Sequence, residues 1–248
     1  MSRLQALLFD CDGVLVDTER DGHRVAFNQA FLQKGLGIDW SIDRYGELLH
    51  TAGGKERMRR DFDETTWPVP EEERDTFIRN LHKMKTDIFI AMISEGKLPL
   101  RPGIARIMQE AIEAGVTIAV CSTSNEQAVQ NIVDALLGKR MSAHISVFAG
   151  DMVKIKKPDP AIYLMAVDRL KLNPNRCVVV EDSHIGLKAA NAAGIRCLVT
   201  KSTYTEHEDF RAATKLVSDL GDTGSAALRL VDFGLMLTQH FTDREAIS

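Results

Sequence analysis

The part of the chain after residue 100 alternates between short apolar runs and segments with helical periodicity, and this alternation restricts its fold the most. The expected elements, in order, are helix 104–114, strand 116–121, helix 126–137, strand 145–148, helix 160–170, strand 176–180, helix 185–193 and strand 195–200. Near-continuous apolar strands joined by helices are typical of a parallel sheet that is covered by helices on both faces. We therefore predict an α/β protein built on such a sheet.

A further strand is expected at residues 4–9, and it runs directly into the acidic sequence Asp10-Cys11-Asp12-Gly13. Because side chains alternate along a strand, Asp10 and Asp12 can point to the same side. Two carboxylates so close raise each other's pKa unless a cation lies between them. Oxygen ligands favour a hard divalent ion, and Mg2+ is the ion we expect. Taken alone, the stretch could also be an acidic turn before a helix.

Polar residues also follow the other expected strands. Ser122 and Thr123 precede a helix, where hydroxyls and backbone N–H groups can bind an anion or can serve as a helix cap. Lys157 lies in a loop before Pro158, and Glu181 is followed by Asp182. Parallel strands place such ends at one edge of the sheet. Together they supply a carboxylate nucleophile, a second carboxylate, hydroxyl donors, a cation and metal ligands, the set that transfers phosphoryl groups through an aspartyl-phosphate.

Residues 18–95 differ from the rest of the chain, because they are charged, favour helix and contain few β-branched runs. Pro99, Pro102 and Gly103 mark the return to the alternating pattern. We predict a core domain of residues 1–17 and 96–248, with a helical cap domain of residues 18–95 inserted after the first strand. A last helix after residue 225 is expected to dock Leu228, Val231, Leu235 and Leu237 on the core.

Composition excludes several classes of protein. The net charge of -4 provides no basic stripe for nucleic acid, and no apolar run approaches the ~20 residues of a membrane helix. The sequence enters its first strand almost at once, so we expect no secretory signal, and it shows no transit peptide. The four cysteines form no CxxC pattern, which predicts buried thiols in a reducing compartment. A soluble intracellular protein is expected.

Four motifs, DCDGVLVDTE, CSTSN, KKPDP and EDS, resemble the four signature motifs of the haloacid dehalogenase-like hydrolase superfamily, in the same order. The resemblance implies a Rossmann-like parallel sheet with a small helical cap of the β-phosphoglucomutase-like branch. Within the cap, GGKER, with ELL before it and HKMKT after it, is similar to CbbY-type proteins. Those proteins are phosphatases linked to Rubisco and the Calvin cycle in photosynthetic bacteria and chloroplasts, and they remove the inhibitor xylulose-1,5-bisphosphate.

The resemblance assigns roles to the core motifs. It implies that Asp10 is the nucleophile and that Asp12 is the general acid and base. Ser122 and Thr123 resemble the residues that hold the transferring phosphoryl group, and Lys157 resembles the lysine that offsets its charge. The implied Mg2+ ligands are the Asp10 carboxylate, the Asp12 backbone carbonyl, Glu181 and Asp182. A true dehalogenase usually lacks the second aspartate, so Asp12 argues against that chemistry.

The cap is expected to select the substrate. A bisphosphate needs a second anion site, which lysine, arginine or backbone N–H groups can supply. The candidate substrate-binding residues in the cap are Glu19, His23, Gly53, Gly54, Lys55, Arg57 and Lys85. Arg59 and Arg60 are expected to lie on a solvated helix face.

The function implied is a Mg2+-dependent sugar-bisphosphate phosphatase that converts xylulose-1,5-bisphosphate to xylulose-5-phosphate. One alternative is a phosphosugar mutase, which shares all four motifs and returns the phosphoryl group to sugar. The other is a non-enzymatic phospho-accepting module, although such receiver domains are much shorter and have no cap. We expect a monomer that binds a small-molecule substrate, with no nucleic-acid or membrane partner. Its expected compartment is the plastid stroma in a photosynthetic eukaryote and the cytoplasm elsewhere.

Overall fold

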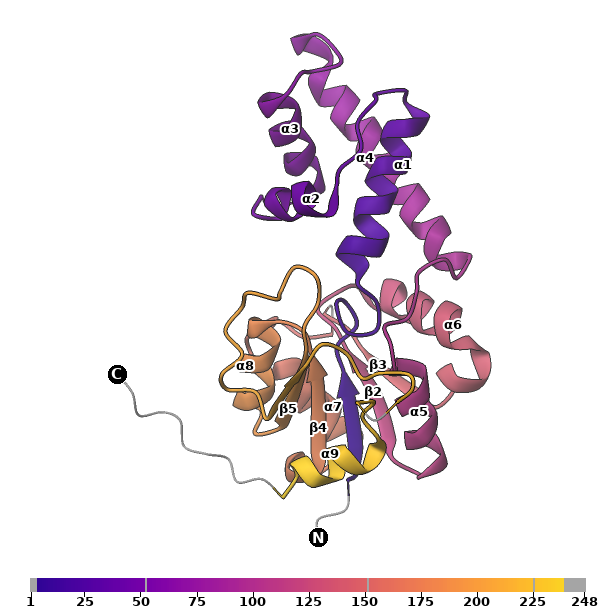
Figure 1. The fold of residues 1–248 in the computed structure, drawn as a ribbon, viewed down its shortest axis with the longest axis vertical. Coiled ribbons are helices and arrows are strands. Elements are labelled where there is room, and N and C mark those ends of the chain that lie inside the picture. Colours follow the sequence, from indigo (N-terminus) through magenta and orange to yellow (C-terminus); the bar gives the residue numbers. More distant parts are fainter. Residues whose placement is uncertain (1–3, 52, 151, 225, 239–248) are drawn as a thin grey trace, which may run out of the picture. The chain divides into compact units, whose positions relative to one another are not determined.

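The chain folds into two compact units, which are described separately. A computed structural model describes residues 4–51, 53–150, 152–224 and 226–238 (Figure 1). The core unit comprises Met1–Asp17 and Pro99–Ser248, and the cap unit comprises Thr18–Leu98. The cap unit extends beyond the expected limit at residue 95. Leu98 is buried and lies next to Gly22, since a Cβ atom added at Gly22 would meet the Leu98 side chain at 3.4 Å.

Within the described residues, the core unit contains a six-stranded sheet with the strand order β3-β2-β1-β4-β5-β6, and every pairing is parallel. The strands are β1 (Ala6–Phe9), β2 (Thr117–Cys121), β3 (Ile145–Phe148), β4 (Cys177–Glu181), β5 (Arg196–Thr200) and β6 (Lys215–Val217). The predicted parallel α/β sheet is confirmed, and β6 is an addition to it. β1 lies between β2 and β4, so the chain order reverses at this strand, which is where open α/β sheets bind ligands.

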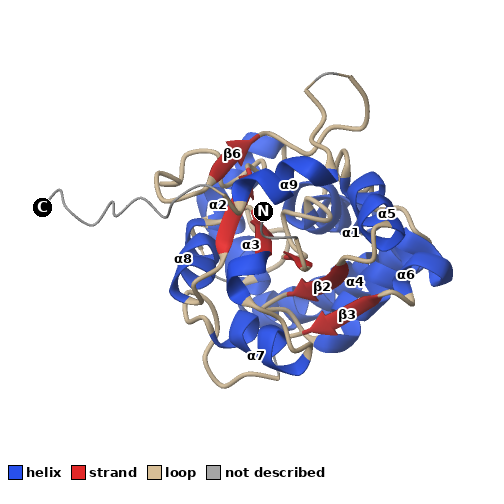
Figure 2. Ribbon diagram, turned by 90° about the horizontal axis from the view of Figure 1, so that it is seen from below, coloured by secondary structure: helices blue, strands red, loops and turns tan. Residues whose placement is uncertain are grey.

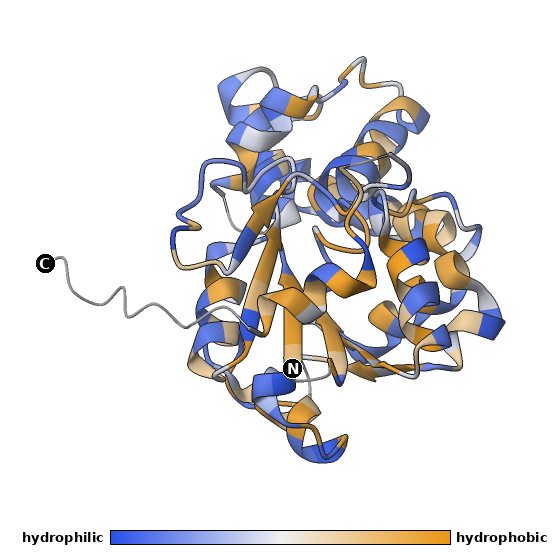
Figure 3. Ribbon diagram, turned by 60° about the horizontal axis from the view of Figure 1, so that its bottom comes forward, coloured by the Kyte–Doolittle hydropathy of each residue, from blue (hydrophilic) through white to orange (hydrophobic). Residues whose placement is uncertain are grey.

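Helices cover both faces of this sheet (Figure 2). Ala6 and Leu8 belong to one buried cluster with residues of α7 (Ala161–Arg169) and α8 (His184–Ala192). The alternate residues Leu7 and Phe9 are also fully buried. On their side, α5 (Ile104–Glu113) packs against β2 and contacts α6 (Glu126–Ser142) and α9 (Leu230–Met236). Figure 3 shows the strands as strongly hydrophobic segments, as burial on both faces requires.

The last helix, α9, docks through a face that differs from the expected one. Leu228 and Leu237 are buried, but Val231 is 65% exposed and Leu235 is 52% exposed. Phe233 and Met236 are buried in their place. The periodicity of the helix explains the difference, because positions 233, 236 and 237 share a face that excludes positions 231 and 235.

The cap unit is helical. A π-helical turn (Thr18–His23) leads into α1 (Arg24–Gln33), α2 (Ile42–Leu49) and α3 (Gly54–Glu64), and a 3-10 turn (Glu71–Glu73) precedes the long α4 (Arg74–Ser94). Its interior contains the fully buried rings of Phe27, Phe31 and Tyr45 around Trp40. The Trp40 indole N–H donates to the buried carboxylate of Asp61 at 2.8 Å.

No helix in the described ranges has the length and apolar character that crossing a membrane demands. Cys11, Cys121, Cys177 and Cys197 are buried free thiols, as the sequence predicts.

Candidate active site

The strand ends of the core unit bring the predicted catalytic residues together. Asp10 follows β1 directly, and its backbone N–H donates to Val180 O of β4 at 2.9 Å. The pairing of Phe9 with Val120 and with Val180 aligns the end of β1 with the ends of β2 and β4. Acidic and hydroxyl side chains from three neighbouring strands therefore meet at one edge of the sheet.

Lys157 connects two of these carboxylates. Its Nζ lies 2.5 Å from Asp10 Oδ1 and 2.7 Å from Glu181 Oε1, and it also donates to Cys121 O at 2.9 Å. The lysine side chain is 3% exposed. Burial alone would lower the pKa of Lys157, but the charges of Asp10 and Glu181 raise it above its usual value. Lys157 is therefore an ammonium ion beside the predicted nucleophile.

Glu181 is fixed from several directions. The buried hydroxyl of Tyr163 on α7 donates to Glu181 Oε1 at 2.7 Å. Glu181 Oε2 accepts hydrogen bonds from the backbone N–H of Asp182 at 3.1 Å and from the Ser183 hydroxyl at 3.2 Å. Gly186 leaves room for this carboxylate, because a Cβ atom there would lie 1.9 Å from Glu181 Oε1. The sequence motifs do not indicate Tyr163, which acts through a tertiary contact.

Asp12 contacts the hydroxyl residues that follow β2. Ser124 Oγ donates to Asp12 Oδ2 at 2.7 Å, and Ser122 Oγ lies 3.4 Å from the same oxygen. The Ser124 backbone N–H donates to Ser122 Oγ at 3.0 Å, which joins the two serines. Between them, Thr123 accepts a hydrogen bond from Lys156 Nζ at its carbonyl oxygen, at 3.0 Å. Ser124, which lies in the CSTSN motif, is thus a further residue of this site beside the predicted Ser122 and Thr123.

The acidic residues of the core site fit a divalent metal ion. Asp10, Glu181 and Asp182 are buried, and each offers a carboxylate oxygen within 4.8 Å of the others. Burial and the neighbouring carboxylates raise the pKa of Asp10 to about 7, although Lys157 opposes this shift. Burial, followed by Glu181 and Asp10, raises the pKa of Asp182 well above its usual value. One lysine therefore does not balance the negative charge, and a hard cation with oxygen ligands would.

The three carboxylates differ in how readily they can bind a metal ion directly. Both oxygens of Glu181 already accept hydrogen bonds, from Lys157 and Tyr163 on one side and from the main chain on the other. Asp10 and Asp182 are therefore the better candidates for direct contact with a metal ion. Gly13 helps to place them, because its φ of +81° suits glycine and a Cβ atom there would lie 1.9 Å from Asp182 Oδ2.

A second polar cluster lies within the cap unit. Lys85 on α4 is buried, and its Nζ lies 2.9 Å from His23 Nδ1 and 4.7 Å from the centre of the Phe27 ring. Burial is the main reason that the pKa of Lys85 falls to about 8. Burial also lowers the pKa of His23 to about 3, and the charges of Lys85 and Arg57 add to that effect. His23 is therefore neutral near pH 7 and can accept a hydrogen bond from Lys85.

Glu19, Tyr45 and Arg57 complete this cap cluster. The Tyr45 hydroxyl donates to Glu19 Oε2 at 2.6 Å, and Arg57 Nη1 donates to that hydroxyl at 3.2 Å. Arg57 also lies 3.7 Å from Glu19 Oε2. The charges of Glu19 and Arg57 both act on Lys85. The structure therefore gathers Glu19, His23, Arg57 and Lys85, and it adds Tyr45, which no sequence motif indicates.

The glycine-rich start of α3 lies beside the cap cluster. Gly53 precedes the helix with a φ of +91°, and a Cβ atom added at Gly54 would lie 3.0 Å from His82 Nε2. Lys55 is exposed, and its charge contributes to the lowered pKa of His82. Arg59 and Arg60 instead form ion pairs of 2.7 Å with Asp75 and Glu64, as expected for a solvated helix face.

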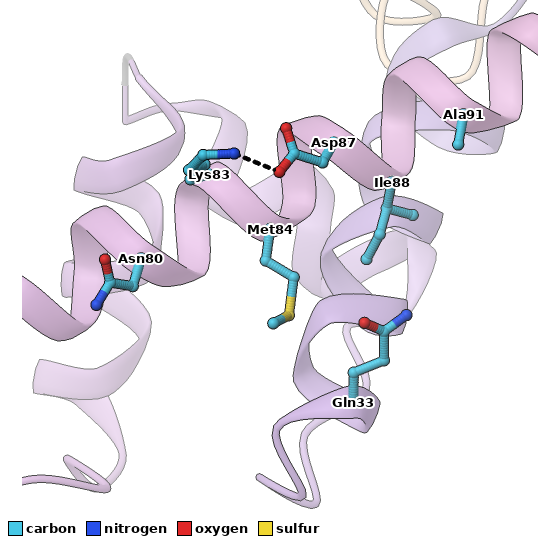
Figure 4. Close-up of a pocket in the computed structure, with 7 residues that line it drawn as sticks. All are labelled: Gln33, Asn80, Lys83, Met84, Asp87, Ile88 and Ala91. Carbon is cyan, nitrogen blue, oxygen red and sulfur yellow. Dashed lines mark hydrogen bonds and ion pairs between the residues drawn. The ribbon is translucent and has the colours of Figure 1, made fainter.

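A separate pocket on the cap unit contains none of these residues (Figure 4). It is formed by one side of α4 with Gln33 of α1, and its lining residues are Gln33, Asn80, Lys83, Met84, Asp87, Ile88 and Ala91. Lys83 and Asp87 form an ion pair of 2.7 Å with each other. The pocket offers no predicted catalytic or substrate-binding residue.

Comparisons with known proteins agree with this arrangement. The family model of the haloacid dehalogenase-like hydrolases matches residues 4–194. A CBBY-like protein of Arabidopsis thaliana is 52% identical over 240 residues, which cover 95% of this chain and 75% of that protein. Protein CbbY of Cereibacter sphaeroides is 42% identical over 230 residues, which cover 90% of this chain and 96% of that protein.

Among solved structures, a mutant of CbbY from Rhodobacter sphaeroides in complex with xylulose-1,5-bisphosphate is similar to this chain. It is 39% identical, with a TM-score of 0.65, and the match covers 91% of this chain and all of that chain. The sheet order, the charged strand ends and these relatives lead to one assignment. This chain belongs to the haloacid dehalogenase-like hydrolase family, among the CbbY-like proteins, and it is a phosphatase.

Proposed function

We propose that the protein is a Mg2+-dependent phosphatase that cleaves xylulose-1,5-bisphosphate to xylulose-5-phosphate through an aspartyl-phosphate. The observation that carries the proposal is the buried contact of 2.5 Å between Lys157 Nζ and Asp10 Oδ1, next to further carboxylates and serine hydroxyls. This set provides a nucleophile, a proton carrier and positive charge at one edge of the sheet.

The reaction has two steps. In the first, a carboxylate oxygen of Asp10 attacks phosphorus, the bond from phosphorus to the sugar oxygen breaks, and Asp12 gives its proton to that oxygen. In the second, Asp12 takes a proton from water, the water oxygen attacks phosphorus, and the bond from phosphorus to Asp10 breaks to release phosphate. The Ser124 hydroxyl bond to Asp12 Oδ2 fits a residue that must be held in place for both proton transfers.

Three positive or hydrogen-bonding groups would act on the transferring phosphoryl group. Lys157 offsets negative charge at Asp10, while the hydroxyls of Ser122 and Thr123 come from the loop that follows β2. Asp10 and Asp182, with the Asp12 backbone carbonyl, would hold Mg2+, and Glu181 would orient Lys157. When bound, Mg2+ supplies further positive charge to the phosphoryl oxygens.

The cap cluster supports a substrate that carries a second phosphate. Lys85 and Arg57 are cations in a largely buried setting, and Glu19 can accept hydrogen bonds from sugar hydroxyls. Lys55 and the backbone N–H groups at the start of α3 lie beside them. The CbbY complex with xylulose-1,5-bisphosphate indicates which bisphosphate to test first. Removal of this Rubisco inhibitor would place the enzyme beside the Calvin cycle, in the chloroplast of a plant.

The test is phosphate release from a panel of sugar monophosphates and bisphosphates, with Mg2+ or with EDTA. We expect selective Mg2+-dependent release from xylulose-1,5-bisphosphate, and its loss in Asp10→Asn. Isomerised sugar phosphate without released phosphate would instead indicate a mutase. No turnover of any small phosphate ester would contradict both enzymatic functions and would favour a phospho-accepting module.

A pair of lysine variants tests the role of the cap. Lys55→Ala should raise KM for the bisphosphate far more than KM for p-nitrophenyl phosphate, which has no second phosphate. Lys83→Ala is the matched control, since Lys83 is an exposed cap lysine that pairs with Asp87. Equal effects of Lys55→Ala on both substrates would contradict the assigned role.

A further inference from the structure

Arg101 holds together segments of the core unit that are far apart in the sequence. Its Nη1 donates to Gly13 O, to Thr200 Oγ1 at 3.0 Å and to Thr200 O at 3.2 Å. Its Nη2 donates to Lys201 O at 2.5 Å and to Ser218 O at 2.7 Å. One guanidinium therefore fixes the loop after β1 to the ends of β5 and β6.

The main chain of Arg101 contacts the same loop. Its backbone N–H donates to Leu15 O at 2.8 Å. The loop is also closed on itself, because Gly13 N–H donates to Val16 O at 2.7 Å and Leu15 N–H donates to Cys11 O at 3.0 Å. The segment that carries Asp12 is thus held by both the backbone and the side chain of Arg101.

Gly13 links Arg101 to the predicted metal ligands. The Gly13 carbonyl oxygen accepts a hydrogen bond from Arg101. The Gly13 Cα lies against Asp182, because a Cβ atom added there would overlap the Asp182 carboxylate. Ser202, which follows the Lys201 carbonyl that Arg101 binds, acts on the same carboxyl and lowers the pKa of Asp182 against the effect of burial. The position of Asp182 relative to the loop of Asp10 and Asp12 therefore depends on contacts that meet at Arg101.

We propose that Arg101 is a positioning residue that sets the geometry of the divalent metal site. The proposal rests on the proposed function, because it takes Asp10, Asp182 and the Asp12 carbonyl as the ligands. Arginine suits this task, since its planar fork presents five N–H donors in fixed directions and can bind carbonyls on two sides at once. Lysine keeps the charge, but its donors all sit on one nitrogen, so it does not reproduce the separate contacts that Nη1 makes with Gly13 O and Nη2 makes with Ser218 O.

The experiment measures Mg2+ affinity without substrate, by isothermal titration calorimetry of the full chain, together with the melting temperature. Because Arg101→Lys preserves the positive charge, any loss of affinity reports the lost geometry. We expect Mg2+ to bind about 10-fold more weakly, the typical effect of changing a residue that orients metal ligands. With p-nitrophenyl phosphate at saturating Mg2+, kcat should fall while KM changes little.

Arg106→Lys is the matched control. Arg106 on α5 also donates to backbone carbonyls, to Gly221 O at 2.6 Å and to Leu228 O at 2.7 Å, and these partners lie outside the candidate active site. Arg106→Lys should lower the melting temperature and leave Mg2+ affinity unchanged within about twofold. If Arg101→Lys does not fold, Thr200→Val removes one acceptor of Arg101 and leaves its backbone acceptors in place, so it should weaken Mg2+ binding less than Arg101→Lys does, by about threefold.

Two results would overturn the proposal, and they differ from each other. If Arg101→Lys and Arg106→Lys both lose thermal stability and both keep wild-type Mg2+ affinity, Arg101 is a structural residue and the proposed function stands. If the wild-type chain binds no Mg2+, the proposed function fails and the role of Arg101 fails with it.

Discussion

The ammonium of Lys157 lies 2.5 Å from Oδ1 of Asp10, and both side chains are almost fully buried. This ion pair is incomplete, because Glu181 shares the lysine and Asp182 adds a further buried carboxylate. A site with more negative than positive charge is less stable without its metal ion, and this imbalance can be measured.

Asp10→Asn should abolish turnover and should stabilise the metal-free protein. The raised pKa of Asp10, about 7, means that its ionised form destabilises the folded state, so stability falls as pH rises from about 4 through 7. At pH 8 in EDTA, asparagine removes this cost, and urea denaturation should show a free energy of unfolding higher by roughly 2 kcal/mol or more. Asp61→Asn should show the opposite sign, because Asp61 pairs with Arg44 at 2.6 Å. A less stable Asp10→Asn protein would contradict the charge imbalance.

Ser124→Ala should lower kcat about 10- to 100-fold and change KM little, because the Ser124 hydroxyl holds Asp12 and has no assigned contact with substrate. Ser124→Thr keeps a hydroxyl and should recover most of the activity. The control is Ser142→Ala, which removes a buried hydroxyl on α6 that donates to Lys139 O of its own helix. Steady-state kinetics with p-nitrophenyl phosphate distinguishes these outcomes, and unchanged kcat in Ser124→Ala would exclude the role.

The bisphosphate should lose affinity in mildly alkaline buffer. Lys85 has a pKa of about 8, so its ammonium loses its proton, and with it the charge that attracts phosphate, as pH rises above 8. The kcat/KM for the bisphosphate, divided by that for p-nitrophenyl phosphate, should fall by up to tenfold per pH unit above this value. In Lys85→Met the ratio should be low and independent of pH over the same range. A wild-type ratio that stays constant to pH 9.5 would remove Lys85 from phosphate recognition.

His23 should make the cap sensitive to acid. Its pKa is about 3 in the folded protein and near 6.5 when exposed, so unfolding takes up a proton between these values, and stability is lost as pH falls below 6.5. The slope is about 1 kcal/mol per pH unit. Urea denaturation between pH 4.5 and 7 should show a shallower dependence in His23→Asn than in the wild type. His207→Asn changes an exposed histidine and should retain the wild-type slope.

Most of the core unit could be predicted because its strands are buried on both faces, and burial leaves a continuous apolar pattern. β3 at Ile145–Phe148 has the predicted limits, β2 and β5 each begin one residue later than expected, and β4 is shifted by one residue. The sequence did not predict β6, because its residues are exposed or half-buried. A strand at the edge of a sheet needs no continuous apolar run. The predicted docking face of α9 was wrong at Val231 and Leu235, because apolar content alone does not determine the rotation of a short helix about its axis.

The candidate active site, like the fold, could be predicted from the sequence only in part. Residues at strand ends could be found from sequence, because a parallel sheet collects such ends at one edge whatever the loops do. Tyr163, Tyr45 and Arg101 could not, since each is defined by a partner far along the chain, such as Glu181 for Tyr163 and Glu19 for Tyr45. A tyrosine in a helix carries no local sign of the carboxylate that it will meet.

The hydrogen bond from Arg101 N–H to Leu15 O joins the two points between which the cap sequence is inserted. The core itself therefore brings these points together, and the inserted segment does not need to hold its own ends. A segment of different length or composition could replace residues 18–98 while the sheet and its strand ends stay intact. Reaction chemistry and choice of substrate can then change independently in evolution, and a chimera that carries another cap should keep the cleavage of simple aryl phosphates.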